Sequence, residues 1–200
     1  GVRLRLSIYG GAKEEQEARI EAEMAGLKAI LGDAIYSDQD DRLEKCIGRM
    51  LAENGKTVSA AESCTGGLIS SLFTSVPGSS EYYLGSVTSY ANSVKTGVLG
   101  VPAEIIEKYG AVSEECVREM AEGVRRITGS DFSVATSGIA GPGGGSDTKP
   151  VGLVCIGVSS QMGTETFRMV FKGDRKRNID RFTANALNLL RKKIQNELNT

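Results

Sequence analysis

Histidine is absent from the 200-residue sequence. Its imidazole is the general base of Ser-His-Asp and Cys-His sites and a frequent metal ligand, because it changes charge near neutral pH. A catalytic triad, a Cys-His pair and a histidine-ligated metal site are therefore excluded within one chain. If a serine or cysteine of this protein is a nucleophile, its general base must be a lysine, tyrosine, aspartate or glutamate.

Cysteine is also scarce, and the sequence has neither a long apolar run nor an excess of one charge. The four cysteines have no CxxC spacing, no signal peptide or membrane-length apolar run is recognisable, and 24 basic against 25 acidic side chains give a net charge of −1. These patterns argue against zinc-finger, transmembrane and nucleic-acid-binding classes. We expect a protein of a reducing, cytoplasmic compartment that uses no metal and no cofactor.

The stretch Ala61-Glu62-Ser63-Cys64-Thr65-Gly66-Gly67 lies between a short apolar strand pattern and an apolar helix pattern that begins at Leu68. Helix N-termini carry unpaired N–H groups and the positive end of the helix dipole, and two glycines allow a ligand to approach the backbone. We therefore expect Ser63 at a strand-to-helix turn that binds an oxyanion or phosphate through residues 64–67. A simpler alternative is that Ser63 or Thr65 only caps the helix. Sequence physics leaves open whether Ser63 or Cys64 is the nucleophile.

Hydrophobic periodicity predicts the order of the elements. Strands are expected at 2–9, 57–61, within 81–92, and at 132–136, 151–159 and 164–171, and helices at 12–31, 41–54, 68–76, from 93, from 101, 114–127 and 175–197. Strands separated by helices and followed by one hairpin favour a three-layer α/β/α sandwich with a mixed sheet. We expect residues 1–35 to be the tail of a preceding domain, 36–40 to be a linker and 41–200 to be the main domain, since one strand and one helix cannot bury a core.

Lys95 is the best candidate for a base, because it follows a strand end shortly after Tyr90. Burial disfavours the charged form of a lysine, and a neutral amine accepts a proton from serine. Tyr90 and Lys95 can face one cavity if the segment bends into a helix, with the tyrosine passing on a proton or holding the lysine in place. The alternative is that Lys95 is an ordinary solvated residue and Tyr90 belongs to the core.

A glycine-rich segment, Gly138 to Ser146, follows the strand that ends at Thr136. Successive backbone N–H groups in such a loop can form an anion nest. Its plain alternative is a flexible surface turn, and Arg175 is a second candidate for contacting a phosphate. The substrate-binding residues that we expect in this part of the chain are Thr136, Gly138, Gly141, Gly143, Gly144, Gly145 and Arg175.

Five motifs in order, AESCTGG, SYANSVK, GAVSEE, SGIAGPGGG and KPVG, closely resemble the CinA family. Residues from about 40 to 197 resemble its C-terminal domain, the nicotinamide-mononucleotide deamidase module. The resemblance implies hydrolysis of nicotinamide mononucleotide to nicotinate mononucleotide and ammonia, with Ser63 as nucleophile and Tyr90 and Lys95 as the other catalytic residues. It also implies a cytoplasmic homodimer, with residues 1–35 ending the middle domain of a longer protein whose N-terminal part resembles a molybdopterin-binding domain.

Two other functions remain open from the sequence. The fold could serve as a regulatory module that binds a pyridine nucleotide without hydrolysing it, or as a dimerisation platform for a larger CinA protein. Ammonia release discriminates the first of these from the deamidase.

Overall fold

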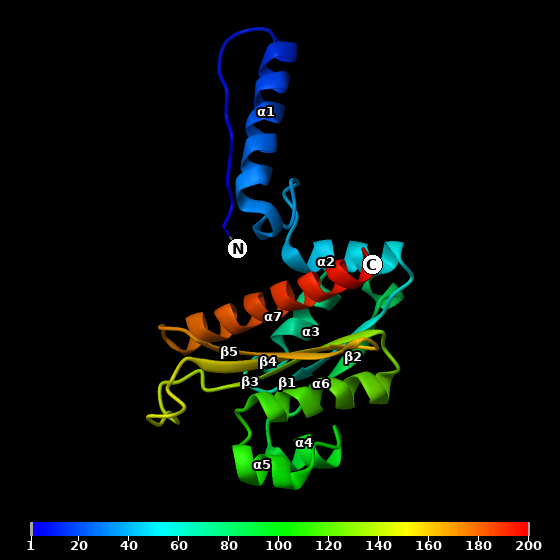
Figure 1. Ribbon diagram of the computed structural model, residues 1–200, viewed down its shortest axis with the longest axis vertical. Helices are drawn as coiled ribbons and strands as arrows, with labels where there is room; N and C mark the ends of the chain where they lie inside the picture. The colour runs from blue at the N-terminus through cyan, green and yellow to red at the C-terminus, as the bar shows by residue number, and fades with distance from the viewer. Residues whose placement is uncertain (1, 200) are drawn as a thin grey trace.

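The computed structural model describes residues 2–199, and its centre is one sheet of five strands (Figure 1). The strands are β1 (Val58–Glu62), β2 (Tyr83–Thr88), β3 (Phe132–Gly138), β4 (Leu153–Ser160) and β5 (Gly163–Val170). Their order is β2-β1-β3-β4-β5; β1 pairs with β2 and β3 in parallel, whereas β4 pairs with β3 and β5 antiparallel. The predicted mixed sheet and its closing hairpin are confirmed.

Helices cover both faces of the sheet, which gives the predicted three layers (Figure 1). They are α1 (Lys13–Leu31), α2 (Leu43–Glu53), α3 (Leu68–Thr74), α4 (Asn92–Gly97), α5 (Ala103–Tyr109), α6 (Glu114–Thr128) and α7 (Arg175–Leu198), with short 3-10 turns η1 (Gly32–Ala34) and η2 (Ser79–Glu81). The helices α2, α3 and α7 lie on one face, and α6 lies on the other with α4 and α5 beyond it. No described helix has the length and apolarity needed to cross a membrane.

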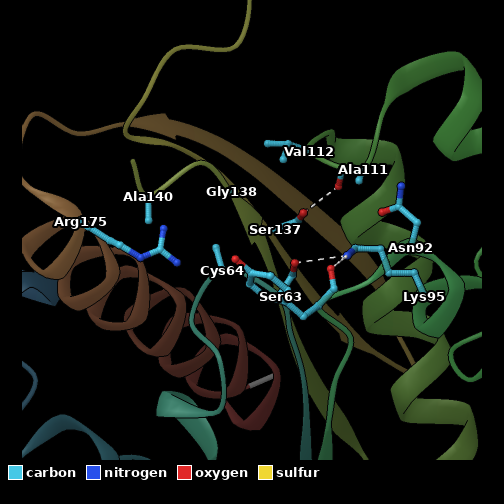
Figure 2. A pocket seen from close by; sticks show the side chains of 11 residues that line it. Ser63, Cys64, Asn92, Lys95, Ala111, Val112, Ser137, Gly138, Ala140 and Arg175 are labelled. Atoms are coloured by element: carbon cyan, nitrogen blue, oxygen red, sulfur yellow. Dashed lines mark hydrogen bonds between the residues drawn. The ribbon is translucent and has the colours of Figure 1, made fainter. Parts of the chain in front are cut away.

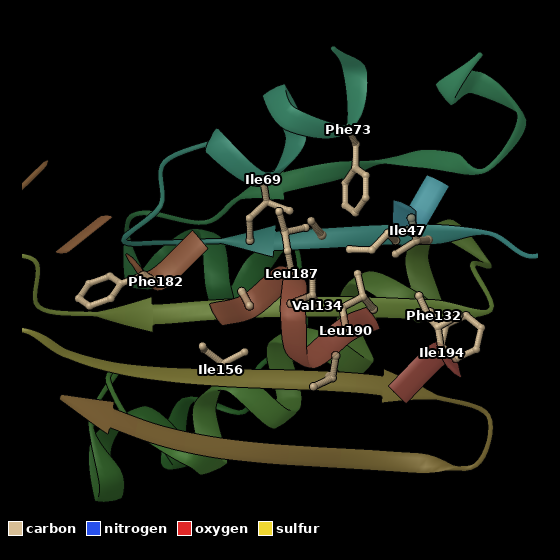
Figure 3. Close-up of a cluster of buried hydrophobic side chains, with 14 of the residues drawn as sticks. Ile47, Ile69, Phe73, Phe132, Val134, Ile156, Phe182, Leu187, Leu190 and Ile194 are labelled. Carbon is tan, nitrogen blue, oxygen red and sulfur yellow. The ribbon is translucent and has the colours of Figure 1, made fainter. Parts of the chain in front are cut away.

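Each face of the sheet has its own hydrophobic core. On the face of α7, Phe73 and Val134 are fully buried together with Phe182 and Leu190 (Figure 3). On the face of α6, the buried cluster includes Val117, Met120 and Val124 of that helix, together with Leu99, Ala61 and Ala135. Because successive side chains of a strand point to opposite faces, Val134 and Ala135 of β3 contribute to different cores. This explains why every residue of β1 is buried.

The strand predicted at residues 2–9 is wrong. These residues form no ladder with the described strands, and Val2, Leu4 and Leu6 are exposed. The helix predicted next to them is present as α1, but none of its residues is buried. Alternating apolar residues form a strand only where a neighbouring strand accepts their hydrogen bonds, and this segment runs beside α1 instead (Figure 1).

Candidate active site

A cavity of about 220 Å³ opens at the carboxyl ends of β1 and β3 (Figure 2). In the sheet β1 lies between β2 and β3, and the chain crosses from β1 to β2 through α3 and from β2 to β3 through α6. The two crossover helices therefore lie on opposite faces of the sheet. Ligands of open α/β sheets bind at such a switch point. The cavity is lined by Ser63, Cys64, Tyr90, Asn92, Lys95, Ala111, Val112, Ser137, Gly138, Ala140 and Arg175.

Ser63 stands one residue beyond the buried strand β1, at the turn into α3. It is only 8% exposed, and its backbone N–H donates to the carbonyl of Thr136 at 3.0 Å. This bond continues the pairing of β1 with β3 past the end of the strand. Ser63 is therefore fixed by its main chain while its hydroxyl remains on the cavity wall.

Lys95 reaches Ser63 from α4 and is 1% exposed. Its Nζ lies 3.2 Å from Ser63 Oγ and donates to the carbonyls of Ser89 at 2.7 Å and Tyr90 at 3.3 Å (Figure 2). Burial lowers the pKa of Lys95, and the small opposing effects come from Cys116 and Cys64. A solvated Lys95, the alternative from the sequence, is ruled out by its burial.

The surroundings of Lys95 suit a neutral amine. Among residues 2–199 no carboxylate forms an ion pair with it. A neutral amine has two N–H donors and one lone pair. Nζ has three acceptors in reach, Ser63 Oγ and the two carbonyls. When the amine is neutral, the carbonyls take its two donors and its lone pair is left for the hydroxyl proton of Ser63. This is the arrangement required of a general base.

The Tyr90 side chain is not where a proton relay needs it. It is 66% exposed at the cavity rim, and the contact with Lys95 is made by its backbone carbonyl. The expected tyrosine and lysine do face one cavity, but the phenol forms no hydrogen bond with Lys95 or Ser63. A core position for Tyr90 is equally wrong, because the side chain points toward solvent at the rim.

Cys64 lines the same cavity, and its environment disfavours a thiolate. The side chain is 7% exposed, and burial raises the pKa of its thiol to about 12. The thiolate is the nucleophilic form of cysteine, so a thiol with this pKa is unreactive at neutral pH. Ser63, whose Oγ lies 3.2 Å from Lys95 Nζ, is the better candidate nucleophile of the two.

The start of α3 is not open to a ligand, contrary to the prediction. The side chain of Glu62, fully buried, accepts the backbone N–H groups of Gly67 at 3.1 Å, Ile69 at 3.1 Å and Ser70 at 2.9 Å. Gly66 donates its N–H to the carbonyl of Ser63. Neither Gly66 nor Gly67 lines the cavity, so both serve the turn, which needs their positive φ angles of 65° and 102°.

Two of the predicted substrate contacts, Thr65 and Thr136, do not line the cavity. The hydroxyls of Thr65 and Thr136 are 2.8 Å apart and hydrogen-bond each other, and both residues are buried. This hydrogen bond connects the turn after β1 to β3. The backbone N–H of Thr65 donates to no acceptor in the described part of the chain, and that of Cys64 interacts only with its own thiol, so Glu62 holds neither of them.

The glycine-rich loop divides between two environments. Gly138 lines the cavity, and the carbonyl of the buried Gly141 accepts a hydrogen bond from Arg175 Nη1 at 2.8 Å. By contrast, Gly143, Gly144 and Gly145 are exposed and do not line it. Of the two phosphate sites that the sequence offers, the geometry favours Arg175, whose guanidinium faces the cavity from the N-terminus of α7 (Figure 2).

Several cavity residues were not singled out from the sequence. Ser137 Oγ donates to the carbonyl of Ala111 at 2.7 Å, and Ala111 and Val112 form part of the wall. Asn92 lies across the cavity from Arg175 (Figure 2). Ala111 and Asn92 belong to the GAVSEE and SYANSVK motifs, so these motifs were the sequence signal for the two positions. No group of three or more Cys, Asp or Glu side chains within residues 2–199 is arranged to hold a metal ion.

Comparisons with known proteins match this chain to one protein family. The model of the CinA C-terminal domain matches residues 40–194. A CinA-like protein of Chloroherpeton thalassium is 46% identical over 96% of this chain and 46% of its own length. A CinA-like protein of Fervidobacterium nodosum is 51% identical over 82% of this chain and 40% of its own length. The chain thus spans less than half the length of these two relatives.

Solved structures extend the match to the fold. The competence/damage inducible protein CihA from Agrobacterium tumefaciens has a TM-score of 0.73 and 37% identity, with 74% of this chain and 91% of that chain covered. The competence damage-inducible protein A from Klebsiella pneumoniae has a TM-score of 0.74 and 35% identity, with 76% and 95% covered.

Proposed function

This chain belongs to the CinA family, and from that premise we propose that it hydrolyses nicotinamide mononucleotide to nicotinate mononucleotide and ammonia. One observation carries the proposal: a buried lysine without a carboxylate partner lies 3.2 Å from the hydroxyl of a serine at a cavity wall. In a protein without histidine, this pair is the available equivalent of a nucleophile and its base.

The reaction begins when neutral Lys95 takes the hydroxyl proton of Ser63. The Oγ atom attacks the carboxamide carbon and forms a tetrahedral intermediate. Protonated Lys95 then donates to the amide nitrogen, the C–N bond breaks, and ammonia leaves an acyl-enzyme. Water, deprotonated by the same lysine, hydrolyses the ester and restores the Ser63 hydroxyl.

The remaining groups of the cavity suit the other parts of the substrate. The amides of Cys64 and Thr65 are the nearest backbone donors for the oxyanion, because the amides from Gly66 to Ser70 already donate to Glu62 or to carbonyls of the turn. Ala111, Val112 and Ala140 offer an apolar wall for the pyridine ring. The guanidinium of Arg175 offers two parallel donors for the phosphate. Tyr90 has no part in proton transfer in this proposal and stands at the rim.

The test is ammonia release from nicotinamide mononucleotide by the purified chain, compared with Ser63→Ala. We expect release by the wild type and its loss in the variant, because the attacking oxygen is gone. Cys64→Ala is the matched control and should retain activity. If the wild type binds the nucleotide but releases no ammonia, the chain is a regulatory nucleotide-binding module and Ser63 is only a ligand contact.

A further inference from the structure

Glu62 is a buried carboxylate that the reaction does not touch. It is 0% exposed, and no Lys or Arg in the described part of the chain pairs with it. Its side chain is instead satisfied by backbone amides at the start of α3, those of Gly67 and Ile69 on one oxygen and that of Ser70 on the other. A carboxylate that accepts several amides is a strong, geometrically specific clamp.

The same residue also holds the segment that carries the base. The backbone carbonyl of Glu62 accepts the N–H of Ser89 at 2.8 Å, and the carbonyl of Ser89 accepts Lys95 Nζ at 2.7 Å. Glu62 is therefore connected to both halves of the catalytic pair. Its side chain fixes the turn around Ser63, and its main chain fixes the acceptor of Lys95.

We propose that Glu62 is a positioning residue that sets the distance between Ser63 Oγ and Lys95 Nζ by clamping the first turn of α3. This inference rests on the proposed function, because it concerns the same nucleophile and base. Residues 63–67 form a turn with two glycines in the left-handed region, and the near end of this turn is anchored to β3 through Ser63 and Thr65. The three amides bound by Glu62 hold the far end of this turn in one place.

The charge and the two acceptor oxygens of Glu62 are both required. A glutamine keeps the shape but replaces one oxygen with an NH₂ group, which then faces either Ser70 N–H or the N–H groups of Gly67 and Ile69. Two donors that face each other in a buried site lose their hydrogen bond and repel. The first turn of α3 must then shift, and Ser63 shifts with it.

The experiment compares Glu62→Gln with Glu44→Gln. Glu44 is 5% exposed on α2 and lines no part of the cavity, so its substitution removes a buried carboxylate without reaching the site. The probe is an alkyl fluorophosphonate, whose phosphorus forms a bond with Ser63 Oγ while fluoride leaves and Lys95 takes the hydroxyl proton. Intact-protein mass at saturation counts the competent sites, so that labelling and turnover rates are expressed per competent site.

We expect Glu62→Gln to label and turn over about 10²-fold more slowly per competent site, the cost of a displacement of about 1 Å in a reacting group. KM should change little, because Arg175 and Val112 are not contacted by Glu62. Glu44→Gln should match the wild type. A merely structural role would lower the number of competent sites and leave the rate of each one unchanged, and that result would overturn the proposal.

A second variant tests the clamp from the donor side. Gly67→Ala strains the backbone at a φ of 102° and displaces the N–H that binds Glu62, while the added Cβ meets only Thr88 Oγ1 at 3.7 Å. Gly67→Ala, like Glu62→Gln, should lower the labelling rate per competent site. If Glu62→Gln does not fold, the labelling rate of Gly67→Ala tests the proposal in its place. Labelling needs no nucleotide. If the wild type labels at Ser63 but releases no ammonia, the proposed substrate is wrong, and the labelling rates still test the clamp.

Discussion

At the residue scale, Lys95 combines deep burial with the absence of a counter-charge. We expect Lys95→Met, which keeps a similar volume without the amine, to lower kcat/KM for ammonia release by about 10²–10⁴-fold, the usual loss for a general base. The measurement is steady-state release from nicotinamide mononucleotide. Lys45→Met, at a lysine whose side chain is 61% exposed on α2, is the control. Activity of Lys95→Met within about tenfold of the wild type would show that the base lies elsewhere.

The same burial predicts a pH dependence of stability. The pKa of Lys95 is lowered from 10.5 by desolvation, so between this lowered value and 10.5 the unfolded chain holds a proton that the folded chain does not. The free energy of unfolding therefore rises with pH through this window. Below the window, burial of the charged lysine lowers the free energy of unfolding. Lys95→Met carries no such penalty.

We thus expect the wild type to gain stability relative to Lys95→Met when the pH is raised from about 7 to about 10. Urea unfolding of both proteins at the two pH values measures it. The other titrating groups are common to both chains and cancel in the difference. A difference that stays constant with pH would contradict a lowered pKa for Lys95.

Part of the site could be predicted from residues alone. Without histidine, a serine at a strand-to-helix turn and a lysine after the next strand were the natural pair, and Ser63 and Lys95 do meet. The contacts of Glu62 could not be foreseen, because its side chain folds back onto amides up to eight residues later in the chain. The exposure of Tyr90 was equally hidden, since the spacing from Lys95 does not tell whether a backbone carbonyl or a phenol makes the contact.

At the element scale, periodicity predicted the sandwich well because most of its elements pack apolar side chains into one of the two cores. The helix α6 and the strand β1 are examples, with Met120 and Ala61 in one core. The same rule failed for residues 2–9, where the alternation is present but no described element covers the apolar side chains. Apolar periodicity thus predicts an element correctly only where neighbouring elements bury its apolar side chains.

The contact between α6 and the segment after α4 links packing to the site. A Cβ added to Gly123 of α6 would clash with the backbone carbonyl of Leu99, and Leu99 follows shortly after Lys95. We expect Gly123→Ala to lower the free energy of unfolding by about 1–3 kcal/mol, more than the ~1 kcal/mol that alanine gains in a helix. Urea unfolding is the measurement. Gly26→Ala in α1, where nothing lies within 4 Å, is the control and should not destabilise. Equal stability of the two variants would contradict the tight packing of α6 on Leu99.

At the scale of the whole molecule, the site and the N-terminal segment lie in different parts of the chain. Every cavity-lining residue falls between Ser63 and Arg175, whereas α1 stands away from the sandwich beside α2 (Figure 1). The two ion pairs that the N-terminal segment forms with later residues in the described part of the chain, Arg3 with Asp40 at 2.6 Å and Lys28 with Asp38 at 2.8 Å, reach only the linker before α2. A hydrogen bond from Arg191 Nη2 to the carbonyl of Asp33 at 2.7 Å joins the segment to α7. The two ion pairs are exposed and contribute little to stability.

Removal of residues 1–34 should therefore leave an active sandwich. The bond from Arg191 to Asp33 is the main loss, and a hydrogen bond to a charged group contributes about 1.5–3 kcal/mol. Arg191 keeps Asn188 and Gln195 as acceptors, and water reaches the guanidinium once the segment is gone. We expect unchanged kcat/KM and a modest fall in the free energy of unfolding, measured beside the full chain. Arg191→Met in the full chain is the control, because it removes the same bond without the truncation. If the shortened chain lost activity while Arg191→Met kept it, residues 1–34 would have to support the site in a way that these contacts do not provide.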